Sequence, residues 1–157
     1  MSPNSILTIV VIIVCFGFAL DRILELLNLR KMKPELPGKL RDFYDEDKYR
    51  RSQQYLREKA RFGLLTSTLS FVITLVVLLT GGLGMLDSWL REWISDPFWL
   101  ALAFFGTLAL VSDLFGMPFS LYNIFVIEEK YGFNKMTVKT WILDKLKGLL
   151  ARTASRR

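Results

Sequence analysis

The 157-residue chain has no histidine and a single cysteine, Cys15. Without imidazole side chains it cannot build the zinc and general-base sites that most often depend on histidine. One cysteine excludes an intramolecular disulfide, and because Cys15 lies in an uncharged apolar run it is best explained as a small packing residue. The chain by itself therefore lacks the side chains of a histidine-dependent active site.

Apolar residues make up 52% of the chain, and long stretches of them carry no charge. Three stretches are long enough to cross a hydrocarbon core of about 30 Å as helices, at about residues 6–29, 62–86 and 97–117. The third is expected to break or kink at Pro118, which lacks an amide donor and disfavours helix in the preceding residue. The sequence therefore predicts an all-α integral membrane protein with about three transmembrane helices and the lipid bilayer as its partner.

Basic residues are distributed unevenly between the connections. Segment 21–61 holds twelve Lys or Arg against eight Asp or Glu, residues from 113 onward hold eight against four, and the 87–96 turn holds one basic residue. By the positive-inside rule, 30–61 and 118–157 are predicted to be cytoplasmic, with the N-terminus outside. The start, MSPNS, has no basic region typical of a signal peptide. Since acids are interleaved with the basic residues, topology explains the net charge of +6 better than nucleic-acid binding does.

The second span is predicted to begin far outside the membrane. Asp45 is a suitable N-cap and nothing from Glu46 to Leu79 breaks a helix, so this helix is about 50 Å long and projects into the cytoplasm as a stalk. The stalk is either a solvated helix anchored at the headgroups, or it walls a chamber or contacts a partner domain. Before it, the prolines and glycine of KMKPELPGKL (31–40) exclude a continuous helix.

Several polar and aromatic residues near the outer turn and in the third span have two possible readings. GGLG (81–84) is predicted to end the second helix, and three tryptophans nearby are interpreted as interfacial anchors rather than ligand stackers: Trp89, Trp93 and Trp99. Asp113 is a possible intramembrane polar site. Alternatively it lies near the inner interface and reaches water or a basic partner such as Arg22.

The end of the third span contains the string FVIEEKYGFNKMT, in which Glu128, Glu129 and Lys130 mark the exit into the cytoplasm. Gly132 is predicted to cap a helix C-terminus, and Asn134 or Thr137 to cap the start of another. An amphipathic helix is expected from 138 to about 150, followed by a polar basic tail, 151–157. The string thus predicts a helix, a turn and a helix.

This string, with the following KTWILDKLKGLL and the upstream loop, resembles the N-terminal membrane region of the CAAX prenyl protease type 1 family, membrane-embedded zinc metalloendopeptidases. The resemblance covers about residues 24–150, so 1–150 is interpreted as one such domain, of bacterial style. It implies helices around a large intramembrane chamber, with zinc held by a downstream His-Glu-x-x-His helix and a glutamate. No catalytic or metal residue maps onto this chain, so zinc is expected only in a full-length member.

The family string has positions of unassigned role: Glu128, Glu129, Lys130, Gly132, Phe133, Asn134 and Lys135. Adjacent residues on a helix point about 100° apart, and no imidazole or cysteine cluster completes a metal site with the two glutamates. They are therefore interpreted as structural or partner-facing.

Two functions follow. The first is a non-catalytic N-terminal domain that forms chamber wall and substrate access for proteolysis by a C-terminal part or a partner chain. The alternative is a stand-alone membrane scaffold or interaction protein derived from that family. A small transporter is disfavoured because three helices offer little room for alternating access. The polar ARTASRR after Leu150 is unlike the hydrophobic span expected in relatives, which predicts a fragment, a broken reading frame or an autonomous protein.

Overall fold

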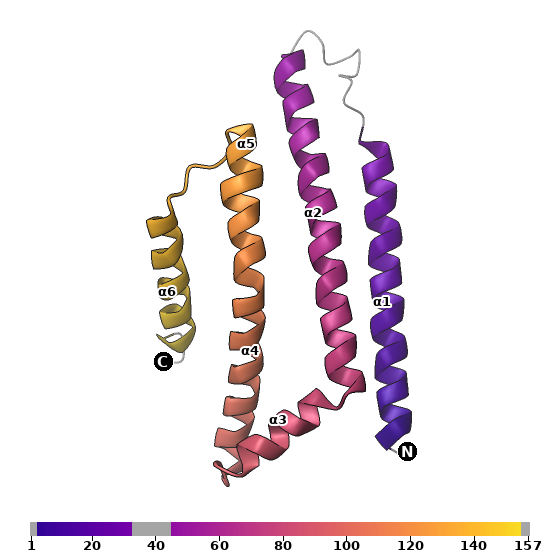
Figure 1. Cartoon of the computed structure of the whole chain (residues 1–157), viewed down its shortest axis with the longest axis vertical. Coiled ribbons are helices and arrows are strands. Elements are labelled where there is room, and N and C mark those ends of the chain that lie inside the picture. The colour runs from indigo at the N-terminus through magenta and orange to yellow at the C-terminus, as the bar shows by residue number, and fades with distance from the viewer. Residues whose placement is uncertain (1–2, 33–44, 155–157) are drawn as a thin grey trace.

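The computed structural model describes residues 3–32 and 45–154, and every element in them is helical. Three long helices stand side by side in Figure 1: α1 (Pro3–Lys31), α2 (Glu46–Leu79), and α4 (Pro97–Tyr122) with its continuations. Their ranges Ser5–Lys31, Glu46–Leu79 and Pro97–Tyr131 are long and apolar enough to cross a membrane. The predicted all-helical membrane class with three spans is confirmed. The proline-rich connection falls almost entirely outside the described residues.

The helices α1 and α2 form an antiparallel hairpin. Phe18 stacks on Phe71 with ring centroids 3.9 Å apart and planes 7° apart. At the other end of α1, the Arg57 guanidinium donates to the Met32 carbonyl at 2.7 Å and so satisfies one of the acceptors exposed at a helix C-terminus. The hairpin is therefore held by an aromatic contact deep in the spans and by a cap at the stalk.

The second helix begins at the predicted N-cap and ends before GGLG, as predicted. The Asp45 carboxylate accepts from the amides of Asp47 and Lys48, and the helix runs 34 residues to Leu79. Gly81 then adopts a left-handed φ of 73°, which only glycine takes up without strain. The span expected to extend to residue 86 is thus wrong at its end, because the chain reverses at Gly81.

A separate short helix, α3 (Gly82–Arg91), replaces most of the expected outer turn. It crosses the base of the molecule from α2 to α4 in Figure 1. Arg91 pairs with Asp87 one turn earlier at 2.7 Å, and this carboxylate raises the pKa of Arg91. The α3–α4 corner holds two of the three buried side chains in the described part of the chain, Leu90 and Leu100.

The third long helix passes through Pro118 without ending. It continues as α4 to Tyr122, then as a π-helix, η2 (Asn123–Glu128), and as α5 (Glu129–Tyr131). The helix therefore does not break at Pro118, and the alternative of a kink there stays a prediction. A proline inside a helix removes the bond to the carbonyl four residues earlier, here that of Leu114, and membrane helices tolerate such a loss; the π-helix that begins at Asn123 is a separate irregularity on the C-terminal side.

After the turn at Gly132, α6 (Val138–Ala154) runs back beside α4 (Figure 1). The helix includes residues 151–154, which were expected to be a polar tail. Thr137 caps its start, since the Thr137 hydroxyl accepts from the Thr140 amide at 3.2 Å. Of the two predicted caps, Thr137 is the one that opens this helix.

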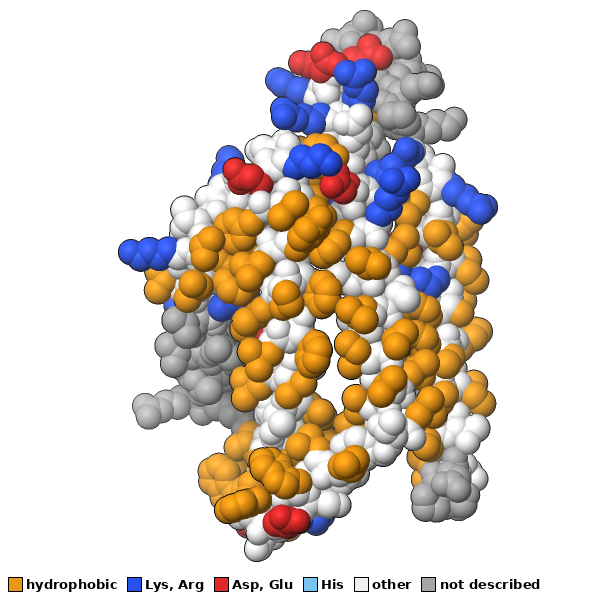
Figure 2. Space-filling model, viewed as in Figure 1, with side chains coloured by type: hydrophobic (Ala, Val, Ile, Leu, Met, Phe, Trp, Pro, Cys, Tyr) orange, Lys and Arg blue, Asp and Glu red, His pale blue; other side chains and the backbone are white. Residues whose placement is uncertain are grey.

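Few side chains are shielded from the surroundings. Ile127 joins Leu90 and Leu100 as the buried residues among those described, whereas large hydrophobic side chains are exposed along all the spans. Figure 2 shows these apolar side chains covering the middle of one face, with charged side chains gathered at the end that holds the stalk. Such a surface is stable in lipid or against further protein, because in water its exposed apolar area would be unfavourable.

Candidate functional site

The family string meets the stalk at the end of the molecule opposite α3 (Figure 1). The Glu128 carboxylate, at the end of η2, accepts from the Tyr55 hydroxyl at 3.3 Å and from the Lys59 ammonium at 3.1 Å on α2. It also accepts from the side-chain amide of Asn123 at 3.2 Å. Its side chain is 22% exposed, so Glu128 points between the two helices rather than into solvent.

A second carboxylate faces the opposite way across the same contact. Glu58 on α2 accepts from the Lys130 ammonium at 2.7 Å and from the Tyr131 hydroxyl at 2.6 Å. The two helices thus exchange an acid and a cation in each direction, since Glu128 of the string meets Lys59 of the stalk and Glu58 meets Lys130. This reciprocal arrangement fixes the register of α2 against η2 and α5.

Aromatic rings fill the space between these ion pairs. The Tyr55 ring lies 4.7 Å from that of Phe133 and 5.7 Å from that of Tyr131, centroid to centroid. The Lys59 and Lys130 ammonium groups each lie 5.3 Å from a tyrosine centroid, at a distance that permits cation–π attraction. We call the whole set the stalk–motif contact; it comprises Tyr55, Glu58 and Lys59 with Glu128, Lys130, Tyr131 and Phe133.

The remaining positions of the string shape the turn. Gly132 has a φ of 74° and ends α5 in the left-handed conformation, which confirms the predicted C-cap. The Glu129 carboxylate accepts from the Asn134 side-chain amide at 2.8 Å, and Asn134 in turn accepts from the Met136 amide at 2.7 Å. The adjacent glutamates therefore serve different partners, while Lys135 is exposed.

The sequence predicted the stalk helix, which carries Tyr55, Glu58 and Lys59, but it did not show that these residues pair with the string. The spacing held a signal, because residues 55, 58, 59 and 62 share one helical face and mix aromatic with charged side chains. Phe62 continues the face downward and packs on Tyr122, with centroids 4.9 Å apart. A mixed face of this kind beside a membrane span indicates an interhelical contact.

Asp113 has a partner in the structure. Its carboxylate lies 3.1 Å from the Lys145 ammonium of α6, and the two side chains are 30% and 31% exposed. The suggested partner Arg22 is wrong, because Arg22 binds elsewhere. Whether Asp113 has a functional role stays a prediction.

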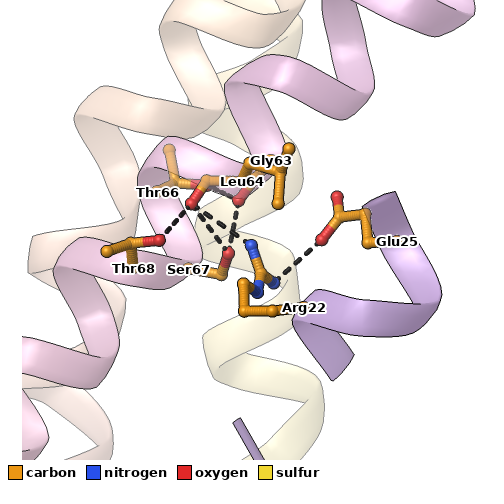
Figure 3. A network of polar contacts seen from close by, with 7 residues as sticks. All are labelled: Arg22, Glu25, Gly63, Leu64, Thr66, Ser67 and Thr68. Atoms are coloured by element: carbon orange, nitrogen blue, oxygen red, sulfur yellow. Dashed lines mark hydrogen bonds and ion pairs between the residues drawn. The ribbon is translucent and has the colours of Figure 1, made fainter. Parts of the chain in front are cut away.

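Arg22 is directed at the backbone of α2 (Figure 3). Its guanidinium donates to the Leu64 carbonyl at 3.3 Å, pairs with Glu25 at 2.8 Å and lies 5.1 Å from the centroid of the Phe18 ring. The same carbonyl accepts from the hydroxyls of Ser67 and Thr68. A charged side chain that donates across the hairpin explains how Arg22 is accommodated in the first span.

Between α2 and α4 the spans stand apart. A cavity of about 640 Å³ lies there, lined mainly by apolar side chains such as Ile73, Leu108 and Phe115. Figure 2 shows an opening between these two columns of side chains. The stalk–motif contact closes one end of the space and α3 closes the other. The lining suits apolar groups.

Neither the stalk–motif contact nor the cavity contains a recognisable set of catalytic or metal-binding residues. Among the residues that the structure describes, no group of three or more His, Cys, Asp and Glu side chains could hold a metal ion. With no histidine in the sequence, the donors present do not fit a protease zinc site. The stalk–motif contact can therefore position helices, and no chemical step is derived from it.

Comparisons with known proteins agree with this geometry. Residues 25–154 match the family described as CAAX prenyl protease N-terminal, five membrane helices. Probable CAAX prenyl protease 1 of Schizosaccharomyces pombe is 33% identical over 156 residues, which cover 87% of this chain and 33% of the relative. CAAX prenyl protease 1 of Saccharomyces cerevisiae is 33% identical over 125 residues, which cover 73% of this chain and 28% of the relative.

A solved structure shares the fold. The crystal structure of S. mikatae Ste24p matches with a TM-score of 0.82 and 28% sequence identity, over 98% of this chain and 37% of that one. The chain thus spans about a third of the length of the proteins it matches. Since the family match covers most of the chain and includes both helices of the stalk–motif contact, the chain belongs to the CAAX prenyl protease N-terminal family.

Proposed function

We propose that this membrane domain forms a chamber wall and a substrate-access path for a CAAX prenyl protease-like zinc metalloendopeptidase, and that a C-terminal part or a partner chain carries out proteolysis. The open space between α2 and α4 supports this function best. The two helices are joined at both ends but separated by an apolar cavity, and only three of the described side chains are buried. Helices that formed a complete bundle would bury far more of each other's apolar surface.

A chimera tests the proposal. This chain replaces the matching region of the S. pombe relative, and cleavage of a prenylated peptide is measured in membranes. Gly116 lines the cavity and an added Cβ meets no atom within 4 Å, so Gly116→Phe places a ring in the space without a clash at the backbone. We expect Gly116→Phe to lower activity at unchanged protein level, while wild-type chimera retains it.

Gly106 on α4 provides the matched control. Its Cβ position is equally open but does not line the cavity, so Gly106→Phe should leave activity near that of the wild-type chimera. Equal effects of the two substitutions would remove the cavity from the proposal.

For the isolated chain we expect no zinc-dependent peptidase activity in detergent. One tightly bound zinc per chain would contradict the proposal, and an absent His-Glu-x-x-His reading frame beyond codon 157 would favour the scaffold function.

We further propose a bacterial plasma membrane with the N-terminus outside and the stalk in the cytoplasm. The gathering of charged side chains around the stalk and α5 supports this orientation (Figure 2). A reporter that is active only in the cytoplasm, fused before residue 1 in one version and inserted at the Gly132 turn in another, should be active at the turn alone.

A further inference from the structure

Asp113 is the only charged residue between Pro97 and Ile127. It lies near the middle of the third candidate span, which runs from Pro97 to Tyr131. Glu128 of the stalk–motif contact is fifteen residues further on, so Asp113 lies about 22 Å deeper along the helix. An ionised carboxylate at this depth is costly unless a partner or water compensates it.

The partner comes from α6. Lys145 lies about two turns into this helix, and its ammonium is 3.1 Å from the Asp113 carboxylate and 5.9 Å from the centroid of the Trp141 ring. Figure 1 shows α6 descending beside α4 from the turn at Gly132, so the pair lies below the cytoplasmic end of the span. This arrangement suggests a deeper position for residues 138–154 than the cytoplasmic one expected from the charge distribution.

On its own, α6 is a poor membrane helix. Lys139, Asp144, Lys145 and Lys147 all lie in its first three turns, and these charges are costly to place in hydrocarbon. In the described part of the chain, the backbones of α6 and α4 are not among the closely approaching pairs of elements. Between the described side chains of the two helices, the structure records the ion pair of Asp113 with Lys145.

We propose that Asp113 is an intramembrane docking site for Lys145, and that this ion pair holds α6 against α4 at membrane depth. Each charge compensates the other, so α6 can leave the interface and lie beside the third span. When the pair is broken, the ammonium group of Lys145 moves toward the lipid headgroups, and α6 shifts toward the membrane interface with it. This inference goes beyond the proposed function and does not depend on it.

Cysteine accessibility measures the position of α6. The probe is Gly148→Cys in a Cys15→Ala background, because Gly148 lies one turn beyond Lys145 and an added Cβ there meets no atom within 4 Å. Membranes containing the full chain are treated with a membrane-impermeant maleimide, after opening so that both faces are reached. We expect slow labelling of the parent and labelling about tenfold faster or more in Asp113→Asn and in Lys145→Met.

Two further variants separate pairing from simple loss of charge or of folding. The exchanged pair, Asp113→Lys with Lys145→Asp, should return labelling to the parent rate, which an unfolded protein would not do. Lys147→Met removes the same charge from an exposed position of α6 and should leave the rate unchanged. Parent rates in both single variants, failure of the exchange to restore protection, or an equal effect of Lys147→Met would each overturn the proposal.

Discussion

Replacing Glu128 with alanine should weaken the stalk–motif contact more than any other single change in the family string. The substitution removes one acceptor and leaves three donors without it, from Tyr55, Lys59 and Asn123, at 3.1 to 3.3 Å. Interhelical hydrogen bonds in membrane proteins contribute about 0.6 kcal/mol on average. The two interhelical bonds, from Tyr55 and Lys59, give about 1.2 kcal/mol, and the local bond from Asn123 within η2 adds about 0.5–1 kcal/mol, so the expected loss is about 2 kcal/mol. Glu128→Gln keeps one acceptor oxygen and should lose about half as much.

The assay is reversible unfolding of the detergent-solubilised chain by SDS, followed by tryptophan fluorescence. Glu129→Ala is the matched control, because it removes the neighbouring charge but only a local bond to Asn134, and should cost about 0.5 kcal/mol. If Glu128→Ala and Glu129→Ala destabilise equally, the contact does not hold α2 to the string. A Glu128→Ala, Tyr55→Phe double variant should be less destabilised than the sum of the single variants, since both remove one shared bond.

The same unfolding assay tests two other features. Arg22→Leu should cost about 1–2 kcal/mol, because it removes the donor to the Leu64 carbonyl and leaves Glu25 without its ion-pair partner. Arg30→Leu, in the exposed last turn of α1, is the control and should change stability by less than about 0.5 kcal/mol. Equal effects of the two substitutions would show that the network in Figure 3 does not join the hairpin. Gly132→Ala should cost about 1–2 kcal/mol through its left-handed φ of 74° alone, since no atom crowds the added Cβ. A neutral Gly132→Ala would mean that the turn relaxes to another conformation.

The parts of the fold that follow from local signals could be predicted from the sequence. Asp45 caps α2 because a carboxylate at that position reaches amides two and three residues ahead. Gly132 ends α5 because only a residue without Cβ takes the left-handed conformation freely. Each of these helix ends is determined by interactions within a few residues, so sequence and structure agree.

The predictions for Pro118 and for the end of the second span differed from the structure because they rested on local preference or hydropathy alone. Pro118 disfavours a helix in water, but in an apolar span breaking the helix would leave more backbone groups unsatisfied, so the helix continues through it to Tyr122. Hydrophobicity continues past Leu79 to residue 86, yet the left-handed Gly81 reverses the chain. Hydropathy alone cannot distinguish one long helix from two helices joined by such a turn.

The partners of Glu58 and Asp113 could not be read from the sequence at all. Lys130 lies 72 residues from Glu58, and Lys145 lies 32 residues from Asp113. Pairing at such separations depends on which helices become neighbours. The position of Asp113 in an otherwise uncharged span showed only that it needed compensation, and Arg22 was one of several cations that could have supplied it.

The stalk–motif contact explains why the cavity between α2 and α4 persists. Two helices joined only by α3 could close onto each other and bury the apolar lining of the cavity. At the far end, however, the reciprocal pairs of Glu58 with Lys130 and Glu128 with Lys59 fix the register, and the aromatic rings between them set the spacing. Closing the cavity would require breaking these contacts at the membrane edge, so the string keeps the two spans apart as well as joining them.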